Sequence, residues 1–304
     1  MAARLILNPA AGGGRALKVY ELLHPFINES HVEVVRTQEP GHATQLAREV
    51  AHLDDMTVIS LGGDGTHNEV INGLLPGQAT FAVIPAGTGN DFVRMLGYPK
   101  NPVDQLAVAL SGATRRLDMG KINDRYFLNA SGVGFDAEVA QWVNQHNKQG
   151  NGTWVYIRGV LRNLLRYRSQ PLTVQLHKAR RQTRTFLLAV GNSQYYAGGM
   201  KICPDANPED GLFQVVWAEN ISALTVLPLL LGVFRGAHVR HPRVKTFMVP
   251  SLTVEGPDNL WVHADGEIMG HLPVTYETVP QAIRVRIGEQ YTQTDDIYRQ
   301  QAAL

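Results

Sequence analysis

Residues 57–69, which read TVISLGGDGTHNE, combine chemically useful residue types at an informative spacing. A short apolar run breaks into glycines around Asp64, and a helical pattern follows. A strand, turn and helix of this kind points backbone N–H groups and a helix N-terminus at an anion. Asp64 adds a hard oxygen ligand of the type that Mg²⁺ prefers. The segment therefore predicts a site for a nucleotide phosphate.

Two other segments share this design, because each ends an apolar run in a glycine-rich turn that opens a helix. They are residues 5–15, LILNPAAGGGR, and residues 81–91, FAVIPAGTGND. If the strands are parallel, the three turns gather at one sheet edge. The structural alternative is that glycine allows positive φ and that Thr66 caps a helix, with Glu69 completing a capping box. Helix capping does not explain why Asp64 stands between two glycines, so we favour a functional role for the three turns.

Neither of two common phosphate-binding fingerprints is present. No Gly-Lys-Ser/Thr occurs, and the glycines at residues 12–14 do not complete Gly-x-Gly-x-x-Gly. Phosphate charge must then be offset by backbone N–H groups, helix ends and Mg²⁺, with help from Arg15. Phosphoryl transfer needs little beyond such positioning and charge stabilisation.

Two oxygen-rich segments lie in the second half of the chain. Asp265 and Glu267 flank Gly266 after an apolar run, and a carboxylate there could accept the proton of an attacking hydroxyl; the alternative is a surface turn. In residues 201–212, KICPDANPEDGL, the oxygens of Asn207 and Asp210 and the carbonyl of Leu212 could hold Mg²⁺ or Ca²⁺. An Asx-type turn is the alternative for this second segment.

The first 120 residues alternate between two patterns. Strand-like runs at 4–8, 32–36, 57–61 and 81–85 alternate with helical patterns at 15–23, 43–52, 66–74, 91–96 and 102–110. Regular β–α alternation predicts an α/β domain with a mostly parallel sheet covered by helices on both faces. We expect this nucleotide-binding domain to span residues 1–120, with the polar tail 290–304 packing back on it.

The pattern changes after residue 120. Strand-like runs at 126–131, 172–177, 183–190, 212–217, 245–249, 261–264 and 282–287 are separated by turn residues, with helical interruptions at 153–168 and 223–234. Many short strands predict an antiparallel β-sandwich. We expect this second domain, residues 121–289, to carry the acceptor side and the catalytic carboxylates.

Composition narrows the class of protein. The 304 residues carry a net charge of +1, which gives no sign of nucleic-acid binding, and the single Cys203 excludes an intrachain disulfide framework. We expect a cytoplasmic protein.

Arg158, Arg162 and Arg166 form one stripe along a predicted helix. The stripe could contact an anionic membrane at the inner membrane face, or it could be a solvated face of the helix. The apolar stretch 221–234 is too short to span a bilayer.

Taken together, the sequence resembles the diacylglycerol kinase catalytic-domain family, specifically the soluble bacterial lipid kinases that share a fold with sphingosine kinases. The matching pieces are Asn8-Pro9 with Gly12, GGDGTxNEVxNG at 62–73, PxGTxNDFxR at 85–94, NxxGxGFDA at 129–137 and DGE at 265–267, with shorter matches between 191 and 242. They occur in order over nearly the whole chain. The first turn departs from the family by having Ala11 where a small hydroxyl residue is frequent, so its backbone must suffice.

The resemblance implies an ATP-dependent kinase that phosphorylates a lipid hydroxyl, with ATP held between an α/β domain and a β-sandwich. It implies nucleotide contacts at Asn8, Pro9, Ala10, Ala11, Gly12, Thr37, Gly62, Gly63, Asp64, Gly65, Thr66, His67, Asn68 and Thr88. Asp64 would help to carry the catalytic Mg²⁺. Glu267 would accept the proton, with Asp265 as its partner or competitor. Asn207, Asp210 and Leu212 would form a separate structural cation site.

Several alternatives stay open at this point. An NAD kinase-like phosphotransferase also uses Gly-Gly-Asp-Gly-Thr, and a non-catalytic nucleotide sensor could keep the same turns. Residues 145–168 and 221–234 match the family only in general character and are the expected acceptor-facing segments. A diacylglycerol-like lipid is the favoured substrate; peripheral membrane contact and a homodimer remain open as further partners.

Overall fold

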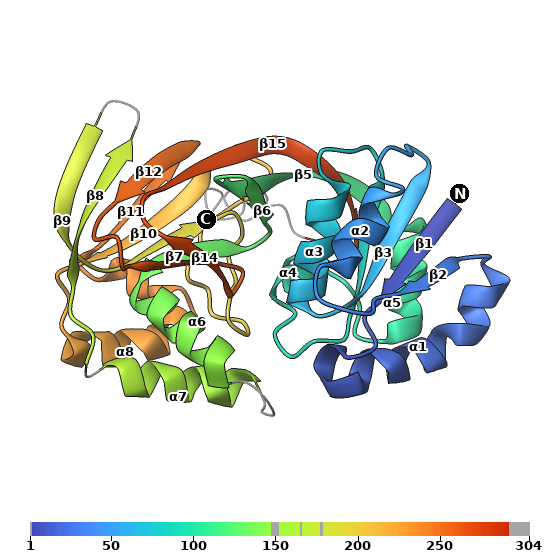
Figure 1. Cartoon of the computed structure of the whole chain (residues 1–304), viewed down its shortest axis with the longest axis horizontal. Helices are drawn as coiled ribbons and strands as arrows, with labels where there is room; N and C mark the ends of the chain where they lie inside the picture. The colour runs from blue at the N-terminus through green and yellow to red at the C-terminus, as the bar shows by residue number, and fades with distance from the viewer. Residues whose placement is uncertain (1, 147–151, 165, 177–178, 292–304) are drawn as a thin grey trace, which may run out of the picture. The chain divides into compact units, whose positions relative to one another are not determined.

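The computed structural model describes residues 2–146, 152–164, 166–176 and 179–291. The chain divides into two compact units, one formed by Met1–Asp118 with the segment that begins at Pro280, the other by Met119–Val279 (Figure 1). The expected packing of the tail 290–304 on the first domain falls, from residue 292, outside the described residues. Within the described part, the N–H of Gly288 donates to the carbonyl of Leu96 at 2.9 Å.

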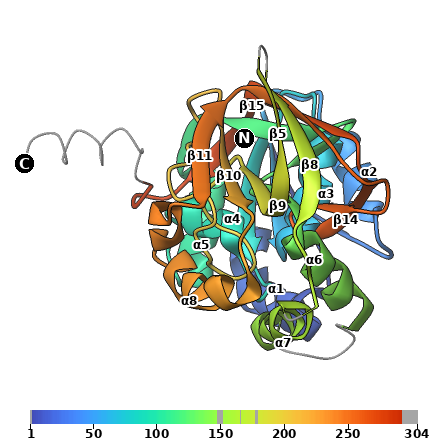
Figure 2. The same ribbon diagram turned by 90° about the vertical axis from the view of Figure 1, so that its left-hand side faces the viewer.

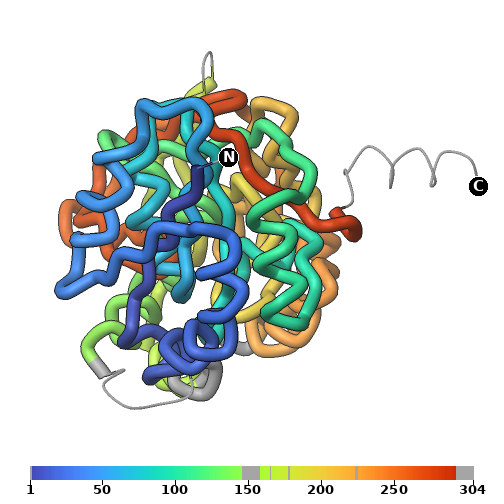
Figure 3. Tube along the Cα trace, turned by 90° about the vertical axis from the view of Figure 1, so that its right-hand side faces the viewer, coloured from blue at the N-terminus to red at the C-terminus, as the bar shows by residue number. Residues whose placement is uncertain are grey.

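A parallel sheet forms the centre of the first unit. Its strand order is β2 (Glu33–Arg36), β1 (Ala2–Leu7), β3 (Met56–Gly62), β4 (Thr80–Pro85) and the last part of β15 (Val274–Ile287), and each neighbouring pair is parallel. The three strands β1, β3 and β4 are nearly continuous apolar runs, as expected for a sheet with helices on both faces. Figure 3 shows this unit, with the returning segment in red among the blue and green elements. The predicted α/β architecture is confirmed.

The helices of this unit divide between the two faces of the sheet. They are α1 (Ala11–Glu29), α2 (His42–Arg48), α3 (Asp64–Leu74), α4 (Asp91–Met95) and α5 (Pro102–Ser111). α1 and α5 pack against Ile59 and Leu61 of β3. Ser60, which points the other way, bonds to a side chain of α3 instead. Alternation along β3 thus assigns α3 to the opposite face.

The capping interpretation of Thr66 is wrong. Helix α3 begins at Asp64, with Gly63 as its N-cap residue and no side-chain cap. Thr66 is therefore inside the helix, where it is buried. The carboxylate of Glu69 accepts the N–H of Ala43 at 3.3 Å, which attaches α2 to α3 instead of closing a capping box.

Antiparallel strands make up the second unit. The main sheet runs in the order β14 (Glu267–His271), β13 (Trp261–Ala264), β7 (Ala130–Gly134), β9 (Ala179–Gly191), β8 (Gln170–Leu176), β12 (Ser251–Glu255) and β15. β10 (Phe213–Glu219) joins β9 to β11 (Val244–Val249), and β5 (Ala113–Ile122) pairs with β15 and β6 (Arg125–Phe127). Phe127, Phe213 and Tyr276 are among the buried residues of the core that these strands enclose. The predicted β-sandwich is confirmed.

Helices cover one outer side of this sandwich. Figure 1 and Figure 2 both show them together: α6 (Phe135–His146), α7 (Gly152–Leu164) and α8 (Ala223–Val233). The 3-10 helix η1 (Ala237–Arg240) follows α8 and contacts it. A second apolar cluster lies beneath them, and it includes Phe135, Phe186 and Val216. None of the described helices combines the length and apolar character needed to cross a bilayer.

Candidate functional site

The three glycine-rich turns of the first unit meet at one edge of the sheet. β1, β3 and β4 are parallel, so the turns that follow them start at the same side. Asn8, directly after β1, donates its backbone N–H to Leu61 at 3.1 Å and its side-chain amide to the Thr66 hydroxyl at 3.0 Å. The N–H of Ala86 donates to Gly62 at 2.6 Å. The gathering expected from the sequence is present.

Close approach of the first and third turns requires glycine at one position. Gly12 has φ +61°, and a Cβ there would overlap the carbonyl oxygen of Ala86. Arg15, where regular α1 geometry begins, donates from Nη1 to the carbonyl of Gly87 at 2.8 Å. Arg15 therefore places its positive charge beside the third turn.

Asp64 connects the second and third turns through its carboxylate. Oδ2 accepts the N–H of Asn90 at 2.8 Å, and Oδ1 accepts the N–H of Asp91 at 3.0 Å. Hydrogen bonds to an ionised carboxylate are stronger than neutral ones, so they fix both turns firmly. The N-terminus of α3 begins at the same residue and adds a positive dipole end. A helix N-terminus of this kind is a common position for a bound anion.

The remaining predicted nucleotide residues fall into two groups. Thr37 follows β2 and donates its N–H to the carbonyl of Leu7 at 2.9 Å, while Thr88 is exposed in the third turn and Gly65 is exposed in the first turn of α3. His67 and Asn68 are buried inside α3. The His67 ring bonds to Ser60 at 2.8 Å, and burial lowers its pKa to about 3. Its imidazole is therefore neutral near pH 7 and bonded to a buried residue of β3.

Two carboxylates, Asp64 and Asp91, could bind a metal ion at the sheet edge where the glycine-rich turns meet. No group of three or more His, Cys, Asp or Glu side chains able to hold a metal occurs among the described residues. Mg²⁺ commonly takes one or two protein carboxylates and completes its shell with phosphate oxygens and water. Asp64 fits that pattern, and so does Asp91, a buried residue at the start of α4 that the sequence reasoning left out. The position of Asp91 at the end of the third glycine-rich turn could have identified it from the sequence.

A tight hairpin presents the carboxylates of the second unit. Asp265 and Gly266 connect β13 to β14 with φ values of 50° and 83°, and Ala264 pairs with Glu267 across the turn. Asp-Gly is favoured in two-residue hairpins because both positions need positive φ. The turn fixes Glu267 as the first residue of β14, and the side-chain amide of Asn144 holds the Gly266 carbonyl at 3.1 Å.

Asp265 and Glu267 have different surroundings. The Asp265 carboxylate accepts the backbone N–H groups of Leu128, Asn129 and Ala130 at 2.7, 2.8 and 3.3 Å. The side chain of Glu267 is 40% exposed and lies 3.3 Å from Nη2 of Arg125. Asp265 is thus occupied in holding the hairpin to the segment before β7, whereas the side chain of Glu267 is partly exposed.

A buried pair below this hairpin was not found from the sequence. Nε2 of His263 lies 3.2 Å from Oδ2 of Asp136, and both side chains are 2% exposed. The pair lies over Gly132, where a Cβ would overlap the Asp136 carboxylate. Three elements, β7, β13 and α6, are thereby joined under the Asp265–Glu267 turn. Only the spatial proximity of distant residues identifies this pair.

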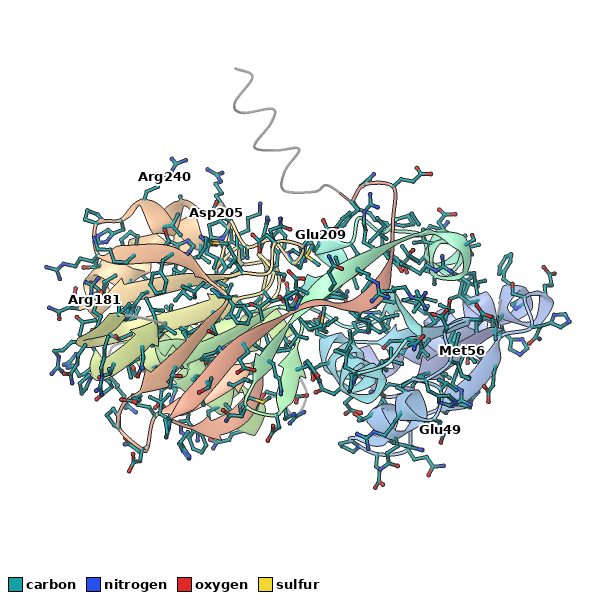
Figure 4. All side chains as sticks on the ribbon, turned by 90° about the horizontal axis from the view of Figure 1, so that it is seen from above. Glu49, Met56, Arg181, Asp205, Glu209 and Arg240 are labelled. Atoms are coloured by element: carbon teal, nitrogen blue, oxygen red, sulfur yellow. The ribbon has the colours of Figure 1, made fainter. Side chains whose placement is uncertain are left out.

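The predicted cation segment forms two Asx-type turns. Oδ1 of Asn207 accepts the N–H of Glu209 at 3.2 Å, and Oδ1 of Asp210 accepts the N–H of Leu212 at 2.9 Å. Figure 4 labels Asp205 and Glu209 in this loop. The turn geometry anticipated as the alternative is present, and a cation held by Asn207, Asp210 and Leu212 stays a prediction.

An apolar cavity of about 70 Å³ lies inside the second unit, between the sandwich and its helices. Its lining includes Phe186 and Val216 from the strands, and Val160, Val226 and Val233 from α7 and α8. Asp136, Tyr196 and His238 bring polar atoms to the lining. Burial lowers the pKa of His238, which favours the neutral ring. The cavity suits an apolar group.

Comparison with known families gives matches over nearly the whole chain. Residues 2–122 match the diacylglycerol kinase catalytic domain, and residues 129–287 match the YegS C-terminal NAD kinase beta sandwich-like domain. The chain is 32% identical over 292 residues to a diacylglycerol kinase of Mycobacterium tuberculosis, covering 92% of this chain and 93% of that protein. It is 29% identical over 289 residues to a diacylglycerol kinase of Staphylococcus aureus, covering 93% and 91%.

A solved structure has the same fold. The crystal structure of a diacylglycerol kinase from Bacillus anthracis superposes with a TM-score of 0.79 and covers 96% of this chain and 98% of its own. Sequence identity in this comparison is 24%, so the likeness concerns the fold.

Proposed function

Because the chain belongs to the diacylglycerol kinase catalytic-domain family, we propose that it is an ATP-dependent lipid kinase. The reaction transfers the γ-phosphate of ATP to the hydroxyl of a diacylglycerol-like lipid. The observation that carries this proposal is the meeting of the three turns at one sheet edge, where Asp64 joins the second and third turns and helix α3 begins. The family assignment rests on the two domain matches and on the 32% identical relative.

The first unit binds the phosphate donor in this proposal. Backbone N–H groups of the turns and of the first turn of α3 hold the phosphate oxygens, as in other helix N-terminal anion sites. Arg15 contributes positive charge beside Gly87. Asp64 and Asp91 would hold Mg²⁺, which supplies Lewis-acid stabilisation of the phosphate charge when bound. Asp64 also keeps the second and third turns in register.

The second unit supplies the base. Glu267 takes the proton of the acceptor hydroxyl, whose oxygen forms a bond to the γ-phosphorus while the bond to the β–γ bridging oxygen breaks and ADP leaves. The exposure of Glu267 supports this role, since a base must reach its substrate. Three backbone N–H groups donate to the Asp265 carboxylate and occupy it, which supports a positioning role there.

A lipid acceptor fits the chemistry of the second unit better than a polar one. The cavity under α7 and α8 is lined almost entirely by apolar side chains. Burying apolar area stabilises a complex by roughly 25 cal/mol per Å². An acyl chain seated beside residues such as Val226 and Val233 would gain from that burial, whereas a dinucleotide would not.

The test is to incubate the protein with radiolabelled ATP and a lipid extract, and to identify labelled product by mass spectrometry. We expect a lipid phosphate. A parallel reaction with NAD distinguishes the NAD kinase-like alternative, and ATP binding without any labelled acceptor would indicate a nucleotide sensor. Label in NADP with none in lipid would reject the proposal.

A further inference from the structure

Helix α8 presents an apolar stripe to solvent. Leu227, Leu231 and Phe234 occupy positions i, i+4 and i+7, so they lie on one side of the helix. Their exposed fractions are 50%, 80% and 50%. Single exposed leucines are normal on the surface of a soluble protein. Large apolar side chains that form one contiguous patch, as these do, indicate an interaction site.

The protein itself covers only the other side of α8. Val226 and Val233 are buried in the cluster between the helices and the sandwich, and Leu229 and Leu230 pack against that cluster. A helix that is apolar on all sides is normally enclosed. The stripe of Leu227, Leu231 and Phe234 is thus the side of α8 that lacks a protein cover among the described residues.

The surrounding sequence is unusually short of carboxylates. Residues 220–254, which contain α8 and η1, carry no Asp or Glu and include Arg235, Arg240, Arg243 and Lys245. Residues 139–204, which contain α7, carry no Asp or Glu and ten Lys or Arg. The chain as a whole has a net charge of only +1. The cations in and next to the helices therefore include Arg158 and Arg162 on α7, Arg235 after α8 and Arg240 on η1, whereas Arg180 and Arg181 of β9 pair with Glu255 and Glu219.

Exposed cations also accompany the stripe in the structure. Arg235 follows Phe234 directly, and Arg240 projects outward from η1 (Figure 4). On α7, which lies with α8 over the same apolar cluster, Arg158 and Arg162 are exposed beside Leu161, itself 53% exposed. Apolar groups bordered by arginine match the two layers of an anionic bilayer surface, hydrocarbon below and phosphate above.

We propose that the stripe of Leu227, Leu231 and Phe234 docks the protein onto an anionic lipid bilayer, with Arg235 and Arg240 contacting headgroup phosphates. α8 has 11 residues and is about 16 Å long, so it lies in the interface and does not span. A second copy of the chain fits this surface less well, because a two-fold contact would bring the same cations together. This inference deepens the proposed function, whose water-insoluble acceptor resides in a bilayer.

Vesicle binding tests this surface without requiring phosphoryl transfer. We expect the protein to sediment with vesicles of equal parts phosphatidylglycerol and phosphatidylcholine, and much less with phosphatidylcholine alone. The double variant Leu231→Ser with Phe234→Ser should bind the anionic vesicles at least ~10-fold more weakly, since each side chain loses its apolar burial. Arg235→Gln with Arg240→Gln should weaken binding and reduce its dependence on salt.

The matched control is Met248→Ser on β11, which removes an apolar side chain that is 39% exposed in the same unit. It should bind as the parent protein does. A polarity-sensitive fluorophore on Leu231→Cys should shift to the blue with anionic vesicles, while one on Met248→Cys should not; the buried Cys203 will not compete for label. Unchanged binding by the double variant, or a dimer that the double variant dissociates, would overturn the proposal. Failure to phosphorylate lipid would leave this vesicle result intact.

Discussion

The backbone N–H of Asn90 donates to Oδ2 of Asp64 at 2.8 Å, which joins two glycine turns that are 26 residues apart in sequence. Asn90 adopts φ +52°, a left-handed conformation to which asparagine is better suited than most residues other than glycine. The Asp64 carboxylate also accepts the next N–H, from Asp91, which holds the turn in this conformation. The aspartate of the Gly-Gly-Asp-Gly segment is thus a structural connector as well as the predicted metal carrier.

Substituting Asp64→Asn should separate these two contributions. The amide keeps one acceptor but turns an NH₂ group toward a backbone donor, so we expect a loss of about 1–3 kcal/mol in the free energy of unfolding. We expect lipid phosphorylation to fall by at least ~100-fold, because charge at the phosphate site is lost as well. Urea unfolding and a transfer assay measure the two effects. Near-parent transfer in a folded Asp64→Asn protein would remove Asp64 from the phosphate site.

Two neighbouring glycines offer a matched test of the first turn. Gly12→Ala brings a Cβ onto the Ala86 carbonyl, whereas a Cβ at Gly13 meets open space; both residues have positive φ. We expect Gly13→Ala to cost about 1 kcal/mol for the backbone conformation alone. Gly12→Ala should cost roughly 1–3 kcal/mol more and weaken ATP binding, since the first and third turns must separate. Thermal unfolding and ATP titration give the comparison, and equal effects at both positions would contradict it.

The buried His67 makes stability depend on pH. Burial lowers its folded-state pKa from 6.5 to about 3, so the unfolded chain binds the extra proton between these values. The contribution of His67 to the free energy of unfolding is therefore fully present above pH 6.5 and is lost as the pH falls toward 3. The loss between pH 7 and pH 5 should be about 2 kcal/mol. Urea unfolding at both pH values measures it, and His67→Gln should show a smaller decrease; an identical decrease would exclude His67 as its source.

Asp265→Asn should act mainly through structure. Its carboxylate holds the N–H groups of Leu128, Asn129 and Ala130, and an amide can satisfy only part of that set. We expect a loss of about 1–3 kcal/mol in the free energy of unfolding and reduced turnover from a misplaced Glu267. If Asp265 is only a positioning residue, the pH dependence of the remaining kcat should keep its shape. A changed profile with unchanged stability would identify Asp265 as the base.

Most of the first unit could be predicted from the sequence because its strands are apolar runs ended by glycine turns. The positions of β1, β3 and β4, and the meeting of their turns, follow from that pattern. The start of α3 could not be read correctly, since Thr66 and Glu69 have capping-box spacing but are engaged elsewhere in the structure. Local spacing does not show where a side chain will find its partner.

The second unit was predicted less completely. β14 reads Glu-Ile-Met-Gly-His and does not alternate, while β12, Ser-Leu-Thr-Val-Glu, alternates over only five residues. β5 begins with exposed polar residues, and α6 follows β7 without an intervening turn. For these reasons the sequence pattern did not predict β5 or α6. The Asp136–His263 pair joins residues 127 positions apart, and only the folded chain brings them together. Long-range pairing is the information that a single sequence lacks.

The measurement that tests the central claim most directly is the effect of Glu267→Gln on ATP binding and on transfer. The side chain is exposed and its ion pair with Arg125 is worth less than about 1 kcal/mol, so the variant should fold normally. We predict ATP affinity within about twofold of the parent, and a loss of at least ~100-fold in lipid phosphorylation because the acceptor proton has no base. Parent-like phosphorylation by a folded Glu267→Gln protein would contradict the account.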